Sequence, residues 1–539
     1  MKKNECIRMR AERLGADLEG VCRAEGQAVF VPGLLPGEET EVRIVRAEKR
    51  YAFGRMEEMP AERSPERREP DCDAWPRCGG CTGRHMRYEA TLDAKRQQVQ
   101  DCFARIGGLE VTVPPVIGME DPFHYRNKTS LPLGERDGRP VLGFYAPRSH
   151  AVIPVKNCPN AMEPADRIAD AFLAWAERYR VTPYQEKTGQ GVLRHLVIRV
   201  NREGQSMVTV VANAAKIPHA EELVQCLQPL GTVSLWLNEN RARNNVILSD
   251  RFRLLWGRET LTDRLFDLMF DLSPASFFQV NPVQTEKLYQ TALDFAELKP
   301  TDLLCDVYCG AGTITLTMAR HCRKAVGIEI VSSAIENAKH NAEKNGIFNT
   351  EFHAGKAEKL LPRMVAEGLR PDVIVVDPPR KGLEPEVIQA IAEAAPDRLV
   401  YVSCNPATLA RDCGLLAGRG YLPQKVQPVD MFCWTSGVET VLLMSQQKPD
   451  DTIHVGIDLK PEDVTVAESK ATYAELQAYI EEKYGFKVSN LYIAQAKAAL
   501  GIKERENYNK PKNPNSKKLV CPPDKMAAIQ EALRHFKMI

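Results

Sequence analysis

The chain has 539 residues, too many for one hydrophobic core, so about three or four domains are expected. Its 72 Lys and Arg nearly balance 71 Asp and Glu, so net charge gives no general attraction to nucleic acid, and any such binding needs a local basic patch. With fifteen cysteines, no apolar leader and no stretch of membrane-spanning length, the sequence argues against a membrane protein and a disulfide scaffold, and predicts a cytoplasmic protein with a metal site or catalytic thiols.

Residues 1–60 are predicted to form a small β-barrel. Short alternating segments, such as 26–31 and 39–44, are separated by Gly and Pro-Gly turns. Basic residues crowd the same region, and the sequence leaves open whether they form an RNA-binding face or only a solvated surface: Arg43, Arg46, Lys49, Arg50 and Arg55.

A central α+β domain is expected over residues 61–89 and 123–272. A Pro-, Arg- and Glu-rich linker at 61–70 precedes it, and the strand-like pattern of 123–272 predicts an antiparallel sheet with helical inserts at 162–179 and 219–227. This domain also carries four thiols that could complete one Cys₄ site: Cys72, Cys78, Cys81 and Cys158. Structural zinc prefers paired short spacings, whereas three clustered cysteines plus a remote one followed by proline indicate iron-sulfur ligation. A [4Fe-4S] cluster is therefore favoured, with zinc as the alternative.

A catalytic α/β domain is predicted from residues 90–122 and 273–446. Residues 90–107 have the pattern of an amphipathic helix, and after Pro274 strands and helices alternate, which is typical of βαβ units around a parallel sheet. Residues 470–539 are expected to form a small helical C-terminal extension with a basic stretch at 503–518. That stretch is compatible with RNA phosphates, but a plain interaction domain fits equally well.

The loop Asp306-Val307-Tyr308-Cys309-Gly310-Ala311-Gly312-Thr313 leaves a predicted strand and enters a helix, so its glycines allow close approach of a ligand. Glu329 ends the next strand, where a carboxylate can accept hydrogen bonds from ribose hydroxyls. The third glycine of a dinucleotide fingerprint is replaced by Thr315, which disfavours a pyrophosphate cofactor. S-adenosylmethionine (SAM) is therefore favoured over a dehydrogenase cofactor or a Rossmann-like core without a ligand.

Two further strand ends carry polar side chains. Asp377 follows the apolar stretch 373–376, and Cys404 follows 399–402. Since the ligand crevice of an open α/β sheet lies outside the carboxyl ends of its strands, both residues are expected in one pocket. Arg380 stands where many base-amine methyltransferases have an aromatic residue, which disfavours an exocyclic amine as the methyl acceptor.

A thiol in this pocket suits one reaction. Carbon 5 of uracil becomes nucleophilic only after another nucleophile adds at carbon 6, a task for the Cys404 thiolate, favoured by Arg380 and by the cationic sulfonium. The C5 proton must then leave, and Glu439 is the expected general base. The alternative readings are a buried structural cysteine and a solvated carboxylate at a strand end.

Together these motifs resemble the bacterial 23S rRNA (uracil-C5)-methyltransferases of the RlmD/RumA/RlmCD type, over about residues 6–445. Further matching segments are Gly20, Phe30-Val31-Pro32-Gly33 and Leu35-Pro36-Gly37-Glu38 for the RNA-binding TRAM barrel of that family, and Tyr125-Arg126-Asn127-Lys128 for its central domain.

The resemblance implies a role for each site residue. Cys404 would be the nucleophile and Glu439 the base. The SAM and target-base pocket would be lined by Gln279, Tyr308, Glu329 and Asp377, and the cluster would be held by Cys72, Cys78, Cys81 and Cys158. The partner would be 23S rRNA with the target uridine flipped out, and the protein a monomer. The chain departs from the family at Gly437, where a histidine is usual, and at Thr313, where some members have asparagine.

Two alternatives remain open. A tRNA uridine could be the acceptor, although the simpler tRNA enzymes resemble the core without the barrel and the cluster motif. A catalytically idle RNA-binding or assembly factor could keep both modules, although the presence of Cys404 together with Glu439 argues against it.

Overall fold

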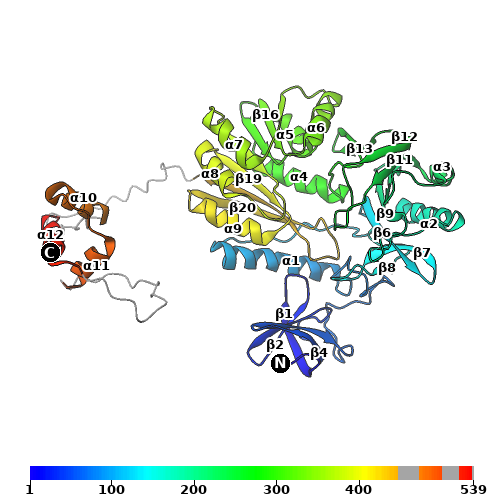
Figure 1. Ribbon diagram of the computed structural model, residues 1–539, viewed down its shortest axis with the longest axis horizontal. Coiled ribbons are helices and arrows are strands. Elements are labelled where there is room, and N and C mark those ends of the chain that lie inside the picture. The colour runs from blue at the N-terminus through cyan, green and yellow to red at the C-terminus, as the bar shows by residue number, and fades with distance from the viewer. Residues whose placement is uncertain (447–472, 500–520, 537–539) are drawn as a thin grey trace. The chain divides into compact units, whose positions relative to one another are not determined.

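The computed structural model describes residues 1–446, 473–499 and 521–536 of the chain, which divides into two compact units, Met1–Pro449 and Asp450–Ile539 (Figure 1). The first unit contains a barrel, a central sheet and the sheet of the predicted catalytic domain, which is called the catalytic sheet below. No helix in the described ranges is long and apolar enough to cross a membrane.

The predicted N-terminal barrel is confirmed. Its strands, drawn in blue in Figure 1, close in the order β1-β2-β3-β5-β4. Their bounds are β1 Cys6–Leu14, β2 Gly20–Ala24, β3 Gln27–Val31, β4 Glu39–Ala47 and β5 Tyr51–Met56. A Cβ at Gly54 would lie 2.3 Å from Val42 Cγ1, so a larger side chain would not fit inside. Outside, Arg43 and Arg55 both pair with Glu57, which neutralises part of the basic face that the sequence suggested.

Seven described strands form the central sheet, in the order β12-β11-β10-β9-β6-β7-β8. The elements are β6 Lys128–Arg136, β7 Arg139–Tyr145, β8 Val152–Pro154, α2 Glu163–Arg178, β9 Leu193–Val200, β10 Ser206–Ala212, α3 Ala220–Leu227, a 3₁₀ turn at Gln228–Leu230, β11 Thr232–Glu239, β12 Phe252–Gly257 and the hairpin β13 Leu261–Leu265 with β14 Leu268–Leu272. The expectation of a wholly antiparallel sheet is wrong at one pair. Strands β10 and β11 run parallel because α3 carries the chain back between them as a crossover.

The catalytic sheet confirms the predicted parallel α/β arrangement. Its order is β17-β16-β15-β18-β19-β21-β20, parallel from β17 to β19, with β21 antiparallel to both of its neighbours. The elements are α1 Tyr88–Cys102 with a π-turn at Phe103–Gly107, α4 Pro282–Ala296, β15 Leu303–Val307, α5 Thr313–Ala319, β16 Lys324–Glu329, α6 Ser332–Lys344, β17 Thr350–Ala354, α7 Ala357–Ala366, β18 Val373–Val376, α8 Pro385–Ala394, β19 Arg398–Ser403, α9 Pro406–Ala417, β20 Tyr421–Val429 and β21 Glu439–Gln446.

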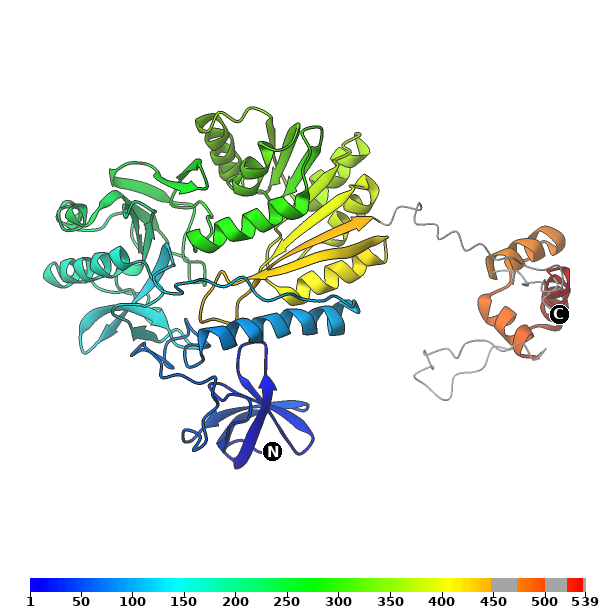
Figure 2. The same ribbon diagram turned by 180° about the vertical axis from the view of Figure 1, so that it is seen from behind.

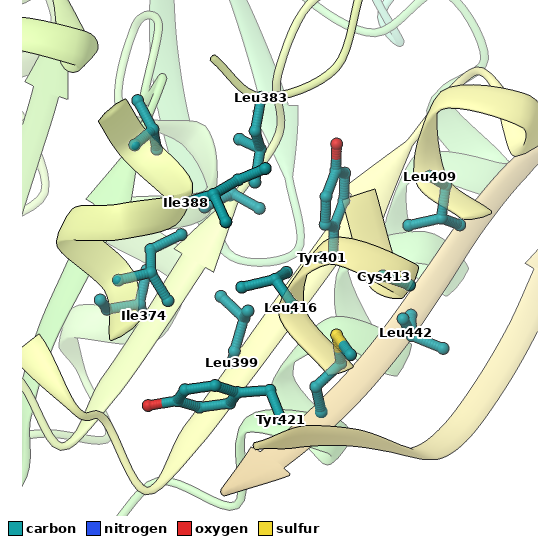
Figure 3. Packing of buried hydrophobic residues seen from close by; sticks show 14 of the residues in the cluster. Ile374, Leu383, Ile388, Leu399, Tyr401, Leu409, Cys413, Leu416, Tyr421 and Leu442 are labelled. Carbon is teal, nitrogen blue, oxygen red and sulfur yellow. The ribbon is translucent and has the colours of Figure 1, made fainter. Parts of the chain in front are cut away.

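Apolar layers cover both faces of this sheet because side chains alternate along each strand. Leu399 and Tyr401 of β19 pack on one face with residues of α8 and α9, as Figure 3 shows, and with residues of α1 and α7. Val400 and Val402 pack on the other face with α4, α5 and α6. Helix α1 precedes the central domain in sequence yet packs against this sheet, beside α9 in Figure 2. This α/β domain is therefore built from two separate stretches of the chain.

The second unit contains three described helices, α10 Tyr473–Tyr484, α11 Asn490–Ala499 and α12 Pro523–His535. Leu476, Ile480, Ile493, Ile529 and Leu533 are buried between them. The basic stretch predicted at 503–518 lies outside the described residues.

Candidate active site

Strand pairing brings Cys404 and Glu439 together. In the antiparallel pair of β19 and β21, the last pair is Ser403 with Thr440, so Cys404 and Glu439 both adjoin this end of the ladder, where the charge of Glu439 acts on the Cys404 thiol. The Glu439 side chain is 3% exposed, and Cys404 is half-buried. A thiol and a carboxyl distant in sequence thus share one end of the sheet.

The turn after β19 is fixed by its own side chains. Asn405 caps α9 by accepting a hydrogen bond from the Ala407 N–H at 3.1 Å, and Pro406 occupies the first helical position, where its lack of an N–H does no harm. The Asn405 amide Nδ2 donates to the Arg380 carbonyl at 3.0 Å. The Arg380 side chain lies close enough to the Cys404 thiol to lower its pKa. One asparagine therefore joins the two strand-end motifs.

Asp377 completes an acidic group around the thiol. It follows β18, and its N–H donates to the Val307 carbonyl at 3.4 Å. Burial raises the pKa of Asp377 above its usual range, and the charge of Asp306 raises it further. Burial likewise raises the pKa of Glu439, with Asp377 adding to the shift and Arg380 opposing it. The protein alone thus favours protonated carboxyls here.

The same surroundings act on the thiol. Burial raises the pKa of Cys404 above its ordinary value, and the charges of Glu439 and Asp377 raise it further, while Arg380 lowers it. Arg380 thus acts in the predicted direction but is outweighed. A positive charge in the acidic pocket would favour the thiolate and both carboxylates.

The glycine loop after β15 is held against the end of β16. The N–H groups of Tyr308 and Cys309 donate to the Ile328 carbonyl at 2.9 and 3.0 Å. Tyr308 has φ +74°, a strained value for a residue with a side chain. The Glu329 carboxylate accepts from the Gly310 N–H at 3.2 Å and from the Val331 N–H at 2.9 Å. Tyr308 and Glu329 therefore stand at neighbouring strand ends.

These residues fit SAM by their chemistry. Ile330 and Val331 follow Glu329 and are 57% and 50% exposed, which provides an apolar surface for an adenine beside a carboxylate for ribose hydroxyls. Asp306 is fully buried beneath the loop, where burial raises its pKa to about 7 despite a 2.5 Å hydrogen bond from the Thr315 hydroxyl. An acidic pocket of this kind suits a sulfonium cation.

Gln279 lies in the connection between β14 and α4, on a different stretch of the chain from the acidic residues. It is 7% exposed, and its carbonyl accepts a hydrogen bond from Asn127 Nδ2 of the central domain at 3.1 Å. Two residues earlier Phe277 is 67% exposed, an unusual position for an aromatic side chain.

Sequence reasoning missed Tyr289. It lies on α4, where an aromatic residue at helical spacing reads as ordinary core, and no local signal distinguished it. The structure buries it and joins its hydroxyl to the Thr313 hydroxyl at 3.0 Å, at the start of α5. Burial raises the pKa of Tyr289, and the charges of Asp377, Asp306 and Glu439 add to the shift. Tyr289 therefore belongs to the acidic site.

The four predicted cluster cysteines gather elsewhere. Cys72, Cys78, Cys81 and Cys158 line one cavity of about 260 Å³. The Gly80 N–H donates to Cys78 Sγ at 3.3 Å, and Asn160 Nδ2 donates to Cys81 Sγ at 3.2 Å. As folded in the described ranges, no three His, Cys, Asp or Glu side chains are arranged to hold a metal ion. The cavity thus brings together suitable donors without closing them into a ligand set.

Comparisons with known proteins indicate the family. A family model described as tRNA (Uracil-5-)-methyltransferase matches residues 241–447, and a TRAM domain model matches residues 4–56. An uncharacterized RNA methyltransferase of Clostridium tetani is 44% identical over 448 residues, which cover 83% of this chain and 97% of the relative. Another from Halalkalibacterium halodurans is 43% identical, covering 82% and 98%.

The chain belongs to the RNA uracil-C5 methyltransferase family. As a member of this family it is a SAM-dependent enzyme. Among solved structures, the Pyrococcus abyssi tRNA (uracil-54, C5)-methyltransferase in complex with S-adenosyl-L-homocysteine matches with a TM-score of 0.65 and 26% identity. The match covers 81% of this chain and all of that one, so it extends well beyond the region of the family model.

Proposed function

We propose that this methyltransferase methylates C5 of a specific uridine in 23S rRNA, with Cys404 as nucleophile and Glu439 as general base. The supporting observation is that the thiol and the carboxyl adjoin the last pair of the β19–β21 ladder and interact electrostatically, at the edge of the sheet that also carries Asp377 and Glu329. This arrangement has a use in uracil-C5 chemistry that a catalytically idle RNA-binding factor would not need.

In the proposed reaction, Cys404 and Glu439 take part in successive changes of bonding on the uracil ring. The Cys404 thiolate forms a bond to C6 of the flipped uracil, and the C5=C6 electron pair moves to C5, which becomes the nucleophile. When bound, SAM supplies the electrophilic methyl group. Glu439 then takes the C5 proton, the C5=C6 double bond re-forms, and the bond from C6 to sulfur breaks to release the Cys404 thiolate.

The raised pKa of Glu439 suits this order of events. A carboxylate whose charged form is destabilised by burial is a stronger base than an exposed one. A bound cation would keep Glu439 ionised early in the reaction, and loss of that positive charge on methyl transfer would restore its basicity when the proton must leave. The residues proposed to hold the cofactor and the target base are Gln279, Tyr308, Glu329 and Asp377.

We also propose that Cys72, Cys78, Cys81 and Cys158 hold a [4Fe-4S] cluster, with zinc as the alternative. Their shared cavity and the N–H donors to Cys78 and Cys81 support this, because thiolates of iron-sulfur clusters commonly accept such hydrogen bonds. Anaerobically purified protein should contain about four irons per chain and absorb in the visible range. One zinc without iron would contradict the assignment.

A tRNA acceptor is the second candidate. The solved neighbour with the broadest similarity described above acts on a tRNA by its name, and it resembles this chain over 81% of its length. Barrel and central domain therefore do not separate the two classes of substrate as the sequence suggested. The proposed division of labour is the same in both cases: residues 1–60 bind RNA, 61–89 with 123–272 carry the thiol site, and 90–122 with 273–446 carry out catalysis.

One experiment tests the mechanism. The protein is incubated with SAM and with 23S rRNA or tRNA transcripts that contain 5-fluorouridine, whose C5 fluorine cannot be removed as a proton. Wild type is expected to remain covalently attached to one class of transcript, and Cys404→Ala is expected to form no adduct. Cys226→Ala, which changes an exposed cysteine on α3, is the matched control. Absence of a wild-type adduct with either RNA, or an equal adduct with Cys404→Ala, would refute the mechanism.

A further inference from the structure

The residues that lead into Glu439 receive hydrogen bonds from several other parts of the fold. We call residues 430–438, which join β20 to β21, the base-leading segment. Glu439 is the first residue of β21, where it pairs with Val429 of β20, so the segment leads directly into the backbone that carries this carboxyl. Three separate parts of the fold bind the segment.

Helix α1 provides the first anchor. Lys95 and Asp430 form an ion pair in which both side chains are 0% exposed. Lys95 Nζ also donates to the Phe432 carbonyl at 3.0 Å, and the Tyr88 hydroxyl donates to Asp430 Oδ2 at 2.7 Å. Burial of two charges is expensive unless their geometry is fixed and their remaining hydrogen bonds are made. These contacts therefore determine one position for the start of the segment.

The second anchor is the beginning of α4. Asn281 Nδ2 donates to the Met431 carbonyl at 3.2 Å, and Gln284 Nε2 donates to the Asp430 carbonyl at 3.2 Å. Both side chains are 0% exposed. Burial of these two carbonyls without hydrogen-bond partners would be unfavourable. The two side-chain amides therefore both satisfy the carbonyls and fix the position of the backbone.

The third anchor is the wall of the thiol-lined cavity. The Tyr125 hydroxyl donates to the Cys433 carbonyl at 3.1 Å, and the Gly83 N–H donates to the Trp434 carbonyl at 2.9 Å. Arg84 lies over the Trp434 ring at 4.9 Å. Tyr125 and Arg84 also line the cavity, as does Thr435 of the segment itself. Trp434 has φ +64°, a strained conformation that its surroundings must maintain.

We infer that the base-leading segment positions Glu439 for proton abstraction, and that Tyr125, Tyr88, Lys95 and Asp430 are its positioning residues. The base-leading segment then links the wall of the thiol-lined cavity to the general base. This inference rests on the proposed function, since it assigns the segment to one step of that reaction.

The two strands at the site make the inference specific. Cys404 follows β19 and precedes the cap of α9, which make none of the anchoring hydrogen bonds described above, whereas Glu439 directly follows the anchored segment. Loosening the segment should therefore leave thiol addition and methyl transfer nearly intact and slow the removal of the C5 proton. Enzyme should then accumulate as a covalent, already methylated complex on ordinary uridine RNA.

The test uses two isosteric variants, Tyr125→Phe and Tyr88→Phe, each of which removes one hydroxyl. Tyr421→Phe is the matched control, because the Tyr421 hydroxyl also donates to a buried backbone carbonyl, that of Pro396 at 3.1 Å, but does not contact the segment. Glu439→Gln serves as the reference for lost base catalysis. Full-length protein is mixed with SAM labelled in its methyl group and with ordinary uridine transcripts, and labelled covalent complex is measured on denaturing gels.

We expect at least about fivefold more labelled covalent complex for Tyr125→Phe and Tyr88→Phe than for wild type, a modest part of the ~10²–10⁴ that general-base catalysis supplies. Tyr421→Phe should match wild type. The inference is overturned if turnover falls without accumulation of the complex, if both variants behave as wild type, or if Tyr421→Phe accumulates it equally. Adducts of wild type on 5-fluorouridine RNA, measured in parallel, show whether the proposed function itself has failed.

Discussion

At the scale of single residues, the site brings together acidic groups whose charged forms are disfavoured by burial in the folded protein. Asp377, Glu439 and Asp306 all have pKa values raised by burial, and Tyr289 contributes a buried hydroxyl to the same group. Functional sites commonly sacrifice stability in this way. The unliganded protein should therefore gain stability when one of these carboxyls is replaced by its neutral amide.

Asp377→Asn provides the residue-scale prediction. A carboxyl whose folded pKa is raised contributes stability that is present below its unfolded pKa, about 3.9, and is lost as pH rises through the folded value. The Asp377→Asn variant has no carboxyl to ionise at this position. Its free energy of unfolding should therefore exceed that of wild type by a difference that grows from pH 5 to pH 8 and reaches about 1–3 kcal/mol.

Urea unfolding of the two proteins without cofactor measures this difference, with methyl transfer expected to fall sharply in the variant. Asn405→Gln, which alters a side chain outside the acidic group, should show no such dependence on pH. A stability difference that stays constant from pH 5 to pH 8 would rule out charge burial at Asp377 as its cause.

At the scale of elements, the turn from β19 into α9 combines two functions in one side chain. Asn405 accepts the capping hydrogen bond from Ala407 and donates another to the Arg380 carbonyl. Loss of a helix cap lowers the free energy of unfolding by about 0.5–2 kcal/mol. Loss of the second hydrogen bond instead detaches the segment that contains Arg380 from the turn that contains the nucleophile.

Two substitutions separate these functions. Asn405→Asp keeps the capping acceptor but loses the donor, so it should unfold at nearly the wild-type urea concentration yet form the 5-fluorouridine adduct more slowly, by about 5- to 30-fold for a hydrogen bond worth ~1–2 kcal/mol. Asn405→Ala should lose both stability and rate. If Asn405→Asp forms the adduct at the wild-type rate, the bond to Arg380 has no part in placing Cys404.

Much of the catalytic sheet could be predicted from the sequence because its signals are local. The strand at 373–376 and the motifs that follow 373–376 and 399–402 depend on short apolar runs and on the residues directly after them. The parallel pairing of β10 with β11 was missed because an antiparallel and a parallel partner give the same apolar pattern. Tyr289 was missed because only folding carries α4 to the acidic site.

At the scale of the whole molecule, the chain divides into two compact units, Met1–Pro449 and Asp450–Ile539. The aligned 448 residues of the Clostridium relative cover 97% of that protein but 83% of this chain. Deletion of residues 450–539 should therefore leave thermal unfolding of the remaining unit and adduct formation at saturating RNA within about twofold of the full chain. Loss of the 5-fluorouridine adduct at saturating RNA would instead make the second unit part of catalysis.

If the extension adds RNA contacts, the deletion should weaken binding and reduce its dependence on salt, because each neutralised phosphate releases counterions. Filter binding at two salt concentrations measures both effects, with a transcript of either RNA class. Unchanged affinity and unchanged salt dependence would assign the extension to a partner other than RNA.

The buried pair of Lys95 and Asp430 also constrains when the enzyme can mature. Its partners are 335 residues apart, so at ~5–20 residues per second a ribosome needs roughly 20 to 70 s between making one and the other. During that interval α1 has emerged without the strand and segment that will cover its lysine. The apolar face of α1 is then available to chaperones or to misfolding, and the barrel can fold long before the catalytic site exists.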